Sequence, residues 1–466
     1  MHALLSEARV QPLIETYGRP VVRDWIRHAL DNLRDQSPGP GTPDTRDAAI
    51  DQVLRRLLDE AETRQTTRIG HVINATGVIL HTGLGRAPLS RRAVAAMTAA
   101  AAGSNVEIDL ESGTRRERGH QLAPLWKRLT GAEASLVVNN NAAATLLALR
   151  SLCSGREVII SRGQLIEIGG SFRLPDIFTE SGAILREVGT TNRTRLSDYA
   201  AAIGPNTAAI LHVHPSNYRI VGFTESPDID ELAGLAHEHN LLAIDDIGSG
   251  SLIDVTRFGL PAEPTFTSSL RAGADLVLGS GDKLLGGPQC GILLGKTAVL
   301  QTIRRHPLTR TVRIDKLTLA ALSGTLESYE RGVAEQEIPV LQLLSAPLSE
   351  LQRRAELLRK QLAGLPSFTF HVEEARAAVG GGSLPAVELP TVVLVVEHAS
   401  QPAESLAHRL RIGTHRVVGR VRNNRLWLDL RSVLPSEDAD LELAVRALAT
   451  HLPAIPHNPP PAGAVF

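Results

Sequence analysis

The chain has 466 residues, of which 43% are hydrophobic and 21% charged, and its formal net charge is -1. This length predicts two or three domains rather than one core, and the composition excludes a disordered or fibrous protein. The near-zero charge excludes a general attraction to nucleic acid, and the lack of a signal-peptide pattern or a membrane-length apolar run predicts a cytoplasmic protein.

The first predicted unit is helical and covers residues 1–66. Apolar side chains recur at roughly helical spacing in two stretches, which are separated by a linker rich in proline and glycine. The unit has nine arginines against eleven acidic residues, so a contact with RNA here would depend on a local patch. The expected helical stretches are residues 4–33, divided by Pro12 and Pro20, and residues 47–64, with the linker at residues 36–45.

Residues 67–335 predict a large α/β domain. From about residue 134, apolar runs of strand length alternate with helical stretches, which implies a mainly parallel, doubly wound sheet with its site at the carboxyl ends of the strands. The expected strands are residues 135–138, 157–161, 184–188, 208–212, 241–245, 276–278 and 292–294, and the clearest helix is residues 142–152.

One lysine in this domain is presented on a glycine-rich loop. An apolar run ends in the Gly/Ser turn at Ser280, Lys283 follows three residues later, and Gly286, Gly287 and Pro288 prevent an ordinary helix. A desolvated lysine loses proton affinity and becomes a nucleophile toward an aldehyde. The loop therefore favours a Schiff base between Lys283 and pyridoxal phosphate, with Ser280 spaced to contact the same ligand.

Two further segments offer partners for such a cofactor. The helix that starts at residues 141–143 (Asn141, Ala142 and Ala143) offers free backbone amides, which are a candidate phosphate site. Asp245 and Asp246 end an apolar strand, and a pyridinium nitrogen needs one carboxylate to stay protonated. Successive strand residues point to opposite faces, so the residues alone leave open which of the two aspartates serves.

No metal site is predicted. His212 and His214 alternate along one strand without a third ligand nearby, so we interpret them as packing or hydrogen-bonding histidines. Cys153 and Cys290 lack the spacing of metal ligands. Beyond the large domain, residues 336–466 predict a small α/β domain that caps the cofactor cleft, with strand-like runs at 392–397 and 425–430 and a helix at 438–448.

Five motifs together resemble a known family. They are residues 74–89 (NATGVILHTGLGRAPL), 161–170 (SRGQLIEIGG), 187–194 (EVGTTNRT), 246–252 (DIGSGSL) and 280–289 (SGDKLLGGPQ). The set is similar to bacterial selenocysteine synthases, the L-seryl-tRNA(Sec) selenium transferases, and the resemblance covers nearly the whole chain. It implies a fold-type I pyridoxal phosphate enzyme in which Lys283 forms the Schiff base and Asp246 meets the pyridinium nitrogen.

The resemblance also implies substrates and partners. Arg86, Arg310 and Arg313 would hold the selenium donor, selenophosphate, and the last two would share a face if their segment is helical. Lys283 would remove the α-proton of seryl-tRNA(Sec), water would leave, and selenium would add to the β-carbon. We expect Asp282 to assist departure of the hydroxyl group. The family further implies a homodecamer, a pentamer of dimers, whose N-terminal domain binds tRNA.

Two alternatives remain open at this point. A pyridoxal phosphate-dependent lyase acting on a small phosphorylated amino compound would share the cofactor core but would not need a separate helical unit. A non-catalytic tRNA-binding protein would give Lys283 and Asp246 no task.

Overall fold

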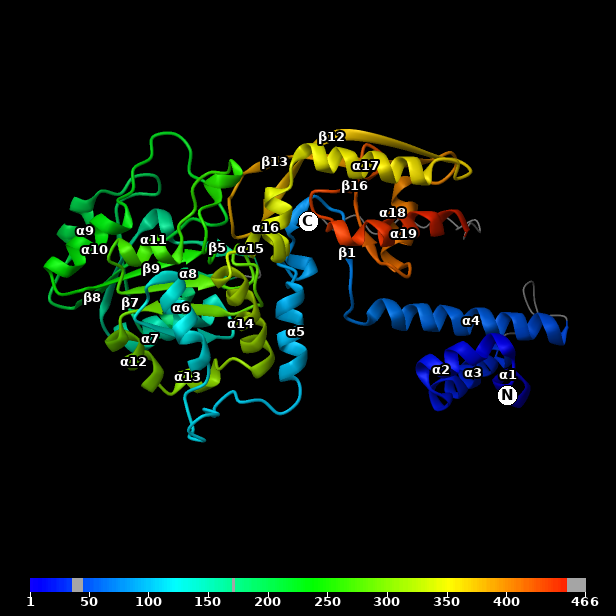
Figure 1. The fold of residues 1–466 in the computed structure, drawn as a ribbon, viewed down its shortest axis with the longest axis horizontal. Coiled ribbons are helices and arrows are strands. Elements are labelled where there is room, and N and C mark those ends of the chain that lie inside the picture. The colour runs from blue at the N-terminus through cyan, green and yellow to red at the C-terminus, as the bar shows by residue number, and fades with distance from the viewer. Residues whose placement is uncertain (36–44, 170–171, 451–466) are drawn as a thin grey trace.

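The computed structural model describes residues 1–35, 45–169 and 172–450. Three regions follow one another along the chain: a helical unit, a large region built on a seven-stranded sheet, and a smaller region built on a five-stranded sheet. Figure 1 shows the N-terminal helices set apart from the large sheet. The predicted linker at residues 36–45 lies, apart from its last residue, outside the described residues.

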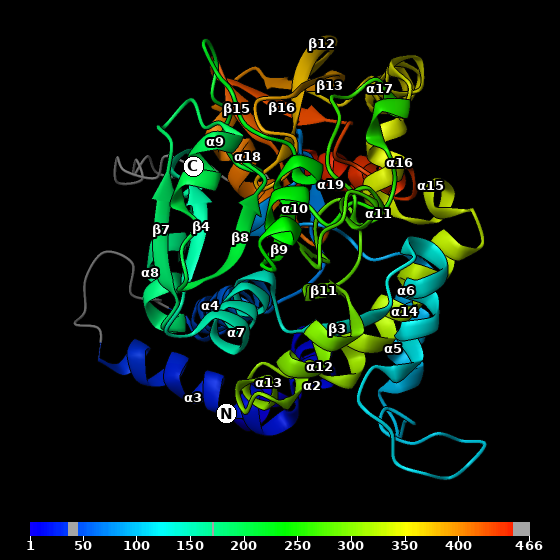
Figure 2. The same ribbon diagram turned by 90° about the vertical axis from the view of Figure 1, so that its left-hand side faces the viewer.

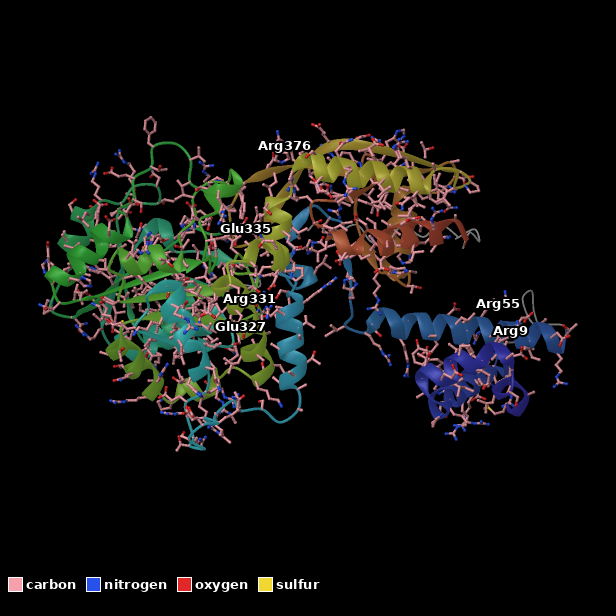
Figure 3. The ribbon with its side chains drawn as sticks, viewed as in Figure 1. Arg9, Arg55, Glu327, Arg331, Glu335 and Arg376 are labelled. Atoms are coloured by element: carbon pink, nitrogen blue, oxygen red, sulfur yellow. The ribbon has the colours of Figure 1, made fainter. Side chains whose placement is uncertain are left out.

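The N-terminal unit is helical, as predicted. Prolines stand at the first or second positions of its second and third helices, where the missing N–H would be unpaired in any case. Val22, Ile26 and Leu57 are buried between the helices. Arg9 pairs with Asp51 across the unit at 3.0 Å, and Figure 3 labels Arg9 and Arg55 on this unit. The helices are α1 (His2–Leu5), α2 (Gln11–Tyr17), α3 (Arg19–Arg34) and α4 (Arg46–Thr67).

The large sheet is mainly parallel, which confirms the predicted fold class. Its strand order is β3-β11-β10-β9-β8-β4-β7, and β11 runs antiparallel to both of its neighbours while the other pairs are parallel. All seven predicted strands are present. They are β3 (Ala134–Val138), β4 (Glu157–Ser161), β7 (Ile184–Val188), β8 (Thr207–Val213), β9 (Leu242–Gly248), β10 (Leu276–Ser280) and β11 (Gly291–Gly295).

Helices cover both faces of this sheet. On one face, α7 (Asn141–Cys153), α8 (Leu174–Ser181) and α12 (Thr297–Arg305) bury one apolar cluster. On the other face lie α6 (Ala123–Thr130), α10 (Ile229–Glu238), α11 (Phe266–Arg271) and α14 (Lys316–Glu330). Figure 2 shows α7 and α12 on one side of the strands and α10 and α11 on the other. Burial on both faces explains why these strands are continuous apolar runs.

The C-terminal region has a five-stranded sheet in the order β15-β16-β13-β12-β2. Its edge strand β2, which pairs with β12, comes from far away in the sequence, and the preceding strand β1 pairs with β14 in a separate two-stranded sheet. Residues 73–80, which we assigned to the large domain, therefore pair with C-terminal strands. The strands are β1 (Ile73–Asn74), β2 (Val78–Leu80), β12 (Phe368–Gly380), β13 (Glu388–His398), β14 (Val417–Val418), β15 (Arg420–Arg422) and β16 (Arg425–Asp429), packed with α17 (Leu348–Leu362), α18 (Ala403–Ile412) and α19 (Asp438–Thr450).

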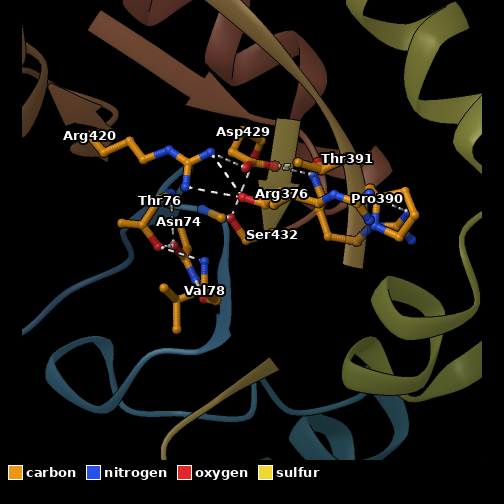
Figure 4. Close-up of polar contacts among 11 residues, drawn as sticks. Asn74, Thr76, Val78, Arg376, Pro390, Thr391, Arg420, Asp429 and Ser432 are labelled. Atoms are coloured by element: carbon orange, nitrogen blue, oxygen red, sulfur yellow. Dashed lines mark hydrogen bonds and ion pairs between the residues drawn. The ribbon is translucent and has the colours of Figure 1, made fainter. Parts of the chain in front are cut away.

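A buried polar network joins residues 73–80 to this sheet (Figure 4). Asp429 is fully buried and accepts hydrogen bonds from Thr391 (2.5 Å) and Arg420 (2.9 Å). Gly77, at φ 78°, has no room for a side chain, because a Cβ would lie 2.3 Å from Oδ2 of Asp429. Arg431 donates to the carbonyls of Leu343 and Pro390. Arg420 and Arg431 therefore make their hydrogen bonds within this polar network.

Among the described residues, no helix combines the length and the apolar character needed to cross a bilayer.

Candidate active site

A cavity of about 200 Å³ lies at the carboxyl ends of β8, β9 and β10. Larger cavities exist elsewhere, up to about 870 Å³, but this one gathers buried ionisable groups at the edge of the sheet where α/β folds bind ligands. It brings together most of the predicted site residues. Those that line it are Arg86, Asn141, Ala142, Asp246, Ser280, Asp282 and Lys283.

Lys283 enters the cavity from the loop after β10. Gly281 allows the turn, because a Cβ there would lie 2.4 Å from Sγ of Cys290. All five lysines of the chain lie among the described residues, and Lys283 alone is buried, at 4% exposure. Burial and the neighbouring Arg86 lower its pKa, against the opposing charges of Asp246, Asp282 and Glu263. The amine is therefore poised to act as a nucleophile or base.

Asp246 lines the cavity from the end of β9, and Asp282 is the second acid in its lining. Its carboxylate accepts hydrogen bonds from Asn141 Nδ2 (2.9 Å), Thr145 Oγ1 (3.1 Å) and the Gly248 amide (3.0 Å). Burial raises the pKa of Asp246, whereas these donors and the charge of Lys283 lower it. The donors and the charge of Lys283 only partly offset burial, so the pKa of Asp246 stays above its ordinary value, and a cationic ring nitrogen beside it would favour the charged carboxylate.

Asp245 points to the opposite face of the sheet. Its Oδ1 lies 2.7 Å from Nδ1 of His212, and its side chain does not line the cavity. His212 is therefore a hydrogen-bonding histidine, as predicted. Among the described residues, no group of three histidine, cysteine or acidic side chains is placed to hold a metal ion.

The predicted phosphate site is the first turn of α7. Asn140 caps the helix, and its Oδ1 already accepts a hydrogen bond from the Ala143 amide at 2.8 Å. Ala143 does not line the cavity, whereas Asn141 and Ala142 do. The amides at the start of a helix have no partner within it, so Asn141 and Ala142 offer two donors and the positive end of the helix dipole. Ser280 lies across from them at the end of β10.

Arg86 and Asp282 form an ion pair at the mouth of the cavity. Nη1 of Arg86 lies 2.9 Å from Oδ2 of Asp282, and the Ala87 amide donates to the Asp282 carbonyl at 3.3 Å. Arg86 has φ 61°, which is uncommon for a residue with a side chain and marks a constrained loop. The pair places a cation and an acid beside Lys283.

Arg310 and Arg313 line a different cavity. It has a volume of about 690 Å³, shares no lining residue with the Lys283 cavity, and also contains Glu107. The helix α13 (Leu308–Thr311) ends before Arg313, which instead forms a β-bridge with Val138, the last residue of β3. The segment from Arg310 to Arg313 is therefore not one helix, and the condition for a shared helical face is not met.

Sequence reasoning missed three contributors to the site. His214 lines the Lys283 cavity, although we interpreted it as a packing or hydrogen-bonding residue. Glu263, 8% exposed, lies beside His214. Gly382 approaches so closely that a Cβ there would lie 2.6 Å from Nζ of Lys283. Only the glycine run at residues 380–382 gave a signal, since glycine clusters accompany close approach of backbone to a functional group.

These residues fit pyridoxal phosphate. The cavity offers one buried amine, one buried carboxylate on a hydrogen-bonded strand end, and the amides of a helix start. Oδ1 of Asn141 is buried and has no hydrogen-bond partner among the described residues, so a polar ligand would satisfy it. The donor set matches an aldehyde that also carries a ring nitrogen and a phosphate.

The comparisons with solved structures support the fold. D-glucosaminate-6-phosphate ammonia-lyase superposes with a TM-score of 0.57 at 20% identity, covering 82% of this chain and 96% of that one. At this identity the likeness shows the fold alone. It agrees with the predicted fold-type I architecture, which the lyase alternative shares.

The comparisons with curated sequences show the family. The profile of L-seryl-tRNA selenium transferase matches residues 72–434, and that of the selenocysteine synthase N terminal matches residues 3–34. The L-seryl-tRNA(Sec) selenium transferase of Hyphomonas neptunium is 45% identical, covering 96% of each chain, and that of Geobacter sulfurreducens is 44% identical, covering 96% of this chain and 97% of the relative. This chain therefore belongs to the L-seryl-tRNA selenium transferase family.

Proposed function

We propose that this protein is a pyridoxal phosphate-dependent enzyme that converts L-seryl-tRNA(Sec) to L-selenocysteinyl-tRNA(Sec), with selenophosphate as the selenium donor. The single observation that supports it most is the buried Lys283 in one cavity with Asp246, in a chain whose full-length relatives bear that activity in their names. The lyase alternative has only the shared fold in its favour.

The cofactor would be held at three points. Lys283 would bind its aldehyde carbon, Asp246 would accept from its ring nitrogen, and the amides of Asn141 and Ala142 with the Ser280 hydroxyl would hold its phosphate. When bound, pyridoxal phosphate supplies an electron sink for the charge that develops at the α-carbon of the seryl group. Asn141 and Thr145 keep the Asp246 carboxylate fixed for that contact.

The chain's own residues perform the proton transfers. The lowered pKa of Lys283 provides a neutral amine that takes the α-proton at Nζ. Protonated Lys283 can return that proton to the departing β-hydroxyl, which leaves as water, and Asp282, the neighbouring buried residue, would assist this departure. The selenium of selenophosphate then forms a bond to the β-carbon while the α-carbon regains a proton, and water cleaves the selenium–phosphorus bond so that phosphate leaves. An Asp282→Asn variant with full turnover would contradict the role of Asp282.

The selenium donor is an anion, and arginine is the residue suited to hold it. Arg86 stands at the mouth of the cavity, and its pairing with Asp282 keeps it there. Because Arg310 and Arg313 line a separate cavity in one chain, we propose that a second copy of the chain joins the two in a homo-oligomer, with a decamer as the expected ring. Equal mixing of the inactive Lys283→Ala and Arg313→Ala proteins should then restore part of the activity.

The N-terminal helical unit is the proposed tRNA-binding part. It presents arginines beside aromatic rings, with the Arg64 guanidinium 5.0 Å from the Trp25 ring centre and that of Arg68 5.6 Å from the Tyr17 ring centre. An enzyme that acts on aminoacyl-tRNA works where translation occurs, so we also propose a cytoplasmic location.

The test of the function is spectroscopic. The purified protein should show the absorbance band of a lysine-bound cofactor, and seryl-tRNA(Sec) should change it while free serine and uncharged tRNA(Sec) should not. A band that responds to small amino compounds but ignores the charged tRNA would support the lyase alternative. No band at all would contradict the assignment of Lys283.

A further inference from the structure

Glu263 is a buried acid that lies beside His214, a residue of the cavity wall, and it has no role in the reaction proposed above. Glu263 precedes α11, and its side chain is only 2% exposed. Among the described residues its one ion-pair partner is a histidine, His214, rather than an arginine or lysine. Burial of a carboxylate is costly unless hydrogen bonds or charges compensate it, so each contact of Glu263 carries weight.

The first contact is with the loop that joins β12 to β13. Oε1 of Glu263 accepts a hydrogen bond from the Leu384 amide at 3.0 Å, in a fully buried setting. Leu384 has φ 50° and Ala386 has φ 59°, conformations that residues with side chains adopt at a cost. A loop held in such a conformation needs an anchor, and the Glu263 carboxylate provides one.

The same loop covers the catalytic amine. A Cβ on Gly382 would lie 2.6 Å from Nζ and 2.7 Å from Cε of Lys283. The backbone at Gly382 therefore lies directly against the lysine side chain, two residues from the Leu384 amide that Glu263 holds. The hydrogen bond from the Leu384 amide to Glu263 therefore joins the C-terminal region to the large-sheet region near the active site.

The second contact is with the cavity wall. Nε2 of His214 lies 3.5 Å from Oε1 of Glu263, and His214 lines the cavity that contains Lys283. Neither His214 Nε2 nor Glu263 Oε2 has a hydrogen-bond partner among the described residues. The His214 ring nitrogen therefore lies beside the Glu263 carboxylate, and a small adjustment of either side chain would form a hydrogen bond between them.

We propose that Glu263 is a positioning residue of the active site, which holds residues 380–386 over Lys283 and orients His214 at the cavity wall. The inference rests on the proposed role of Lys283. It goes beyond that role because it assigns to Glu263 the coupling between the C-terminal loop and the catalytic amine.

The charge of Glu263 also acts on Lys283. The charged groups that face this amine are Arg86, Asp246, Asp282 and Glu263. Arg86 lowers the pKa of Lys283, and the three acids raise it. Replacing Glu263 by an uncharged residue should therefore lower the pKa of Lys283 and increase the fraction of free amine at neutral pH.

The test uses the full-length protein freed of cofactor and measures the pH dependence of Lys283 acetylation by peptide mass spectrometry. Glu263→Gln keeps the size of the side chain and an oxygen that can accept from the Leu384 amide. We expect its Lys283 to react at least about threefold faster at neutral pH, with the whole profile displaced to lower pH. Glu335→Gln, at a half-buried acid paired with Arg257, is the matched control and should leave the profile unchanged.

Two further variants distinguish the hydrogen bond that holds residues 380–386 from the effect of the Glu263 charge on Lys283. Glu263→Ala removes the acceptor for Leu384, so limited proteolysis within residues 380–386 should become at least about fivefold faster than in the wild type. Gly382→Ala leaves Glu263 intact but pushes the loop off the lysine, and it should raise Lys283 reactivity without a large displacement of the pH profile.

Unchanged Lys283 profiles in Glu263→Gln, together with unchanged loop cleavage in Glu263→Ala, would overturn the proposal. Since these measurements need neither cofactor nor turnover, they are independent of the proposed function. A Lys283→Ala protein that still attached the cofactor covalently would refute the proposed function while leaving the Glu263 results intact.

Discussion

Two neighbouring aspartates on β9 have opposite surroundings. Asp246 faces the α7 side of the sheet, accepts three hydrogen bonds, and shares a cavity with Lys283. Asp245 faces the other side and pairs with His212. Both are buried, so burial alone does not distinguish them. The difference lies in their partners: Asp246 accepts hydrogen bonds from uncharged donors beside a cavity, whereas Asp245 pairs with the titratable, half-buried His212 away from that cavity. We infer that the first is a functional acid and the second a structural one.

The largest expected effect comes from neutralising each aspartate in turn and comparing the two losses of activity. Asp246→Asn should lower turnover about 10²- to 10³-fold, because the group that holds the cofactor ring nitrogen loses its charge. Asp245→Asn should cost no more than about tenfold, roughly 1.4 kcal/mol. Steady-state formation of selenocysteinyl-tRNA, with circular dichroism to verify folding, gives the ratio. Equal losses in the two variants would remove the distinction between the two faces.

A smaller effect is expected when Asp246 loses one of its donors. Thr145→Val removes the hydroxyl that donates to Oδ2, and we expect about a tenfold loss of turnover together with weaker cofactor binding. Thr325→Val is the matched control, because that buried threonine donates to the Ala321 carbonyl within α14 and faces no ligand. A Thr145→Val enzyme with wild-type affinity for the cofactor would show that Asp246 does not need this support.

The smallest effect is expected on the Asp245 side, in stability rather than turnover. Burial lowers the pKa of His212, but the charge and hydrogen bond of Asp245, together with the charges of Asp228 and Asp246, outweigh it and raise the pKa above the ordinary 6.5. A raised pKa means that protonation stabilises the fold. This contribution is fully present below about pH 6.5 and is lost as the pH rises through the folded value. His212→Gln should therefore cost about 1 to 2 kcal/mol at pH 6 and less at alkaline pH, measured by urea unfolding. A cost that does not vary with pH would mean that His212 is neutral throughout.

Much of the fold was accessible from local sequence patterns. The strands of the large sheet were predicted because each is a short apolar run between breakers, and β4 and β7 begin and end at the predicted residues. The pairings of β1 with β14 and of β2 with β12 were not predicted. These contacts join residues more than 290 positions apart, and two- or three-residue strands carry no periodicity from which to infer them.

The site was predicted in part for the same reason. Lys283, Asp282 and Ser280 belong to one loop, so the local sequence brings them together. Strand alternation put Asp245 and Asp246 on opposite faces, but only the packing of α7 shows which face holds the cavity. Glu263 and Gly382 come near Lys283 from separate segments. The glycine run at residues 380–382 indicates a close approach but not the group that is approached, and an isolated acid such as Glu263 gives no sign of its partner.

The central claim is that Lys283 carries the cofactor, and reductive trapping tests it most directly. Borohydride treatment of the purified protein fixes a lysine-bound pyridoxal phosphate covalently, and peptide mass spectrometry locates it among five lysines. We expect the added mass on the peptide that contains Lys283, and its loss in Lys283→Ala. Label on Lys127, Lys296, Lys316 or Lys360, or an active enzyme with no label, would contradict the account.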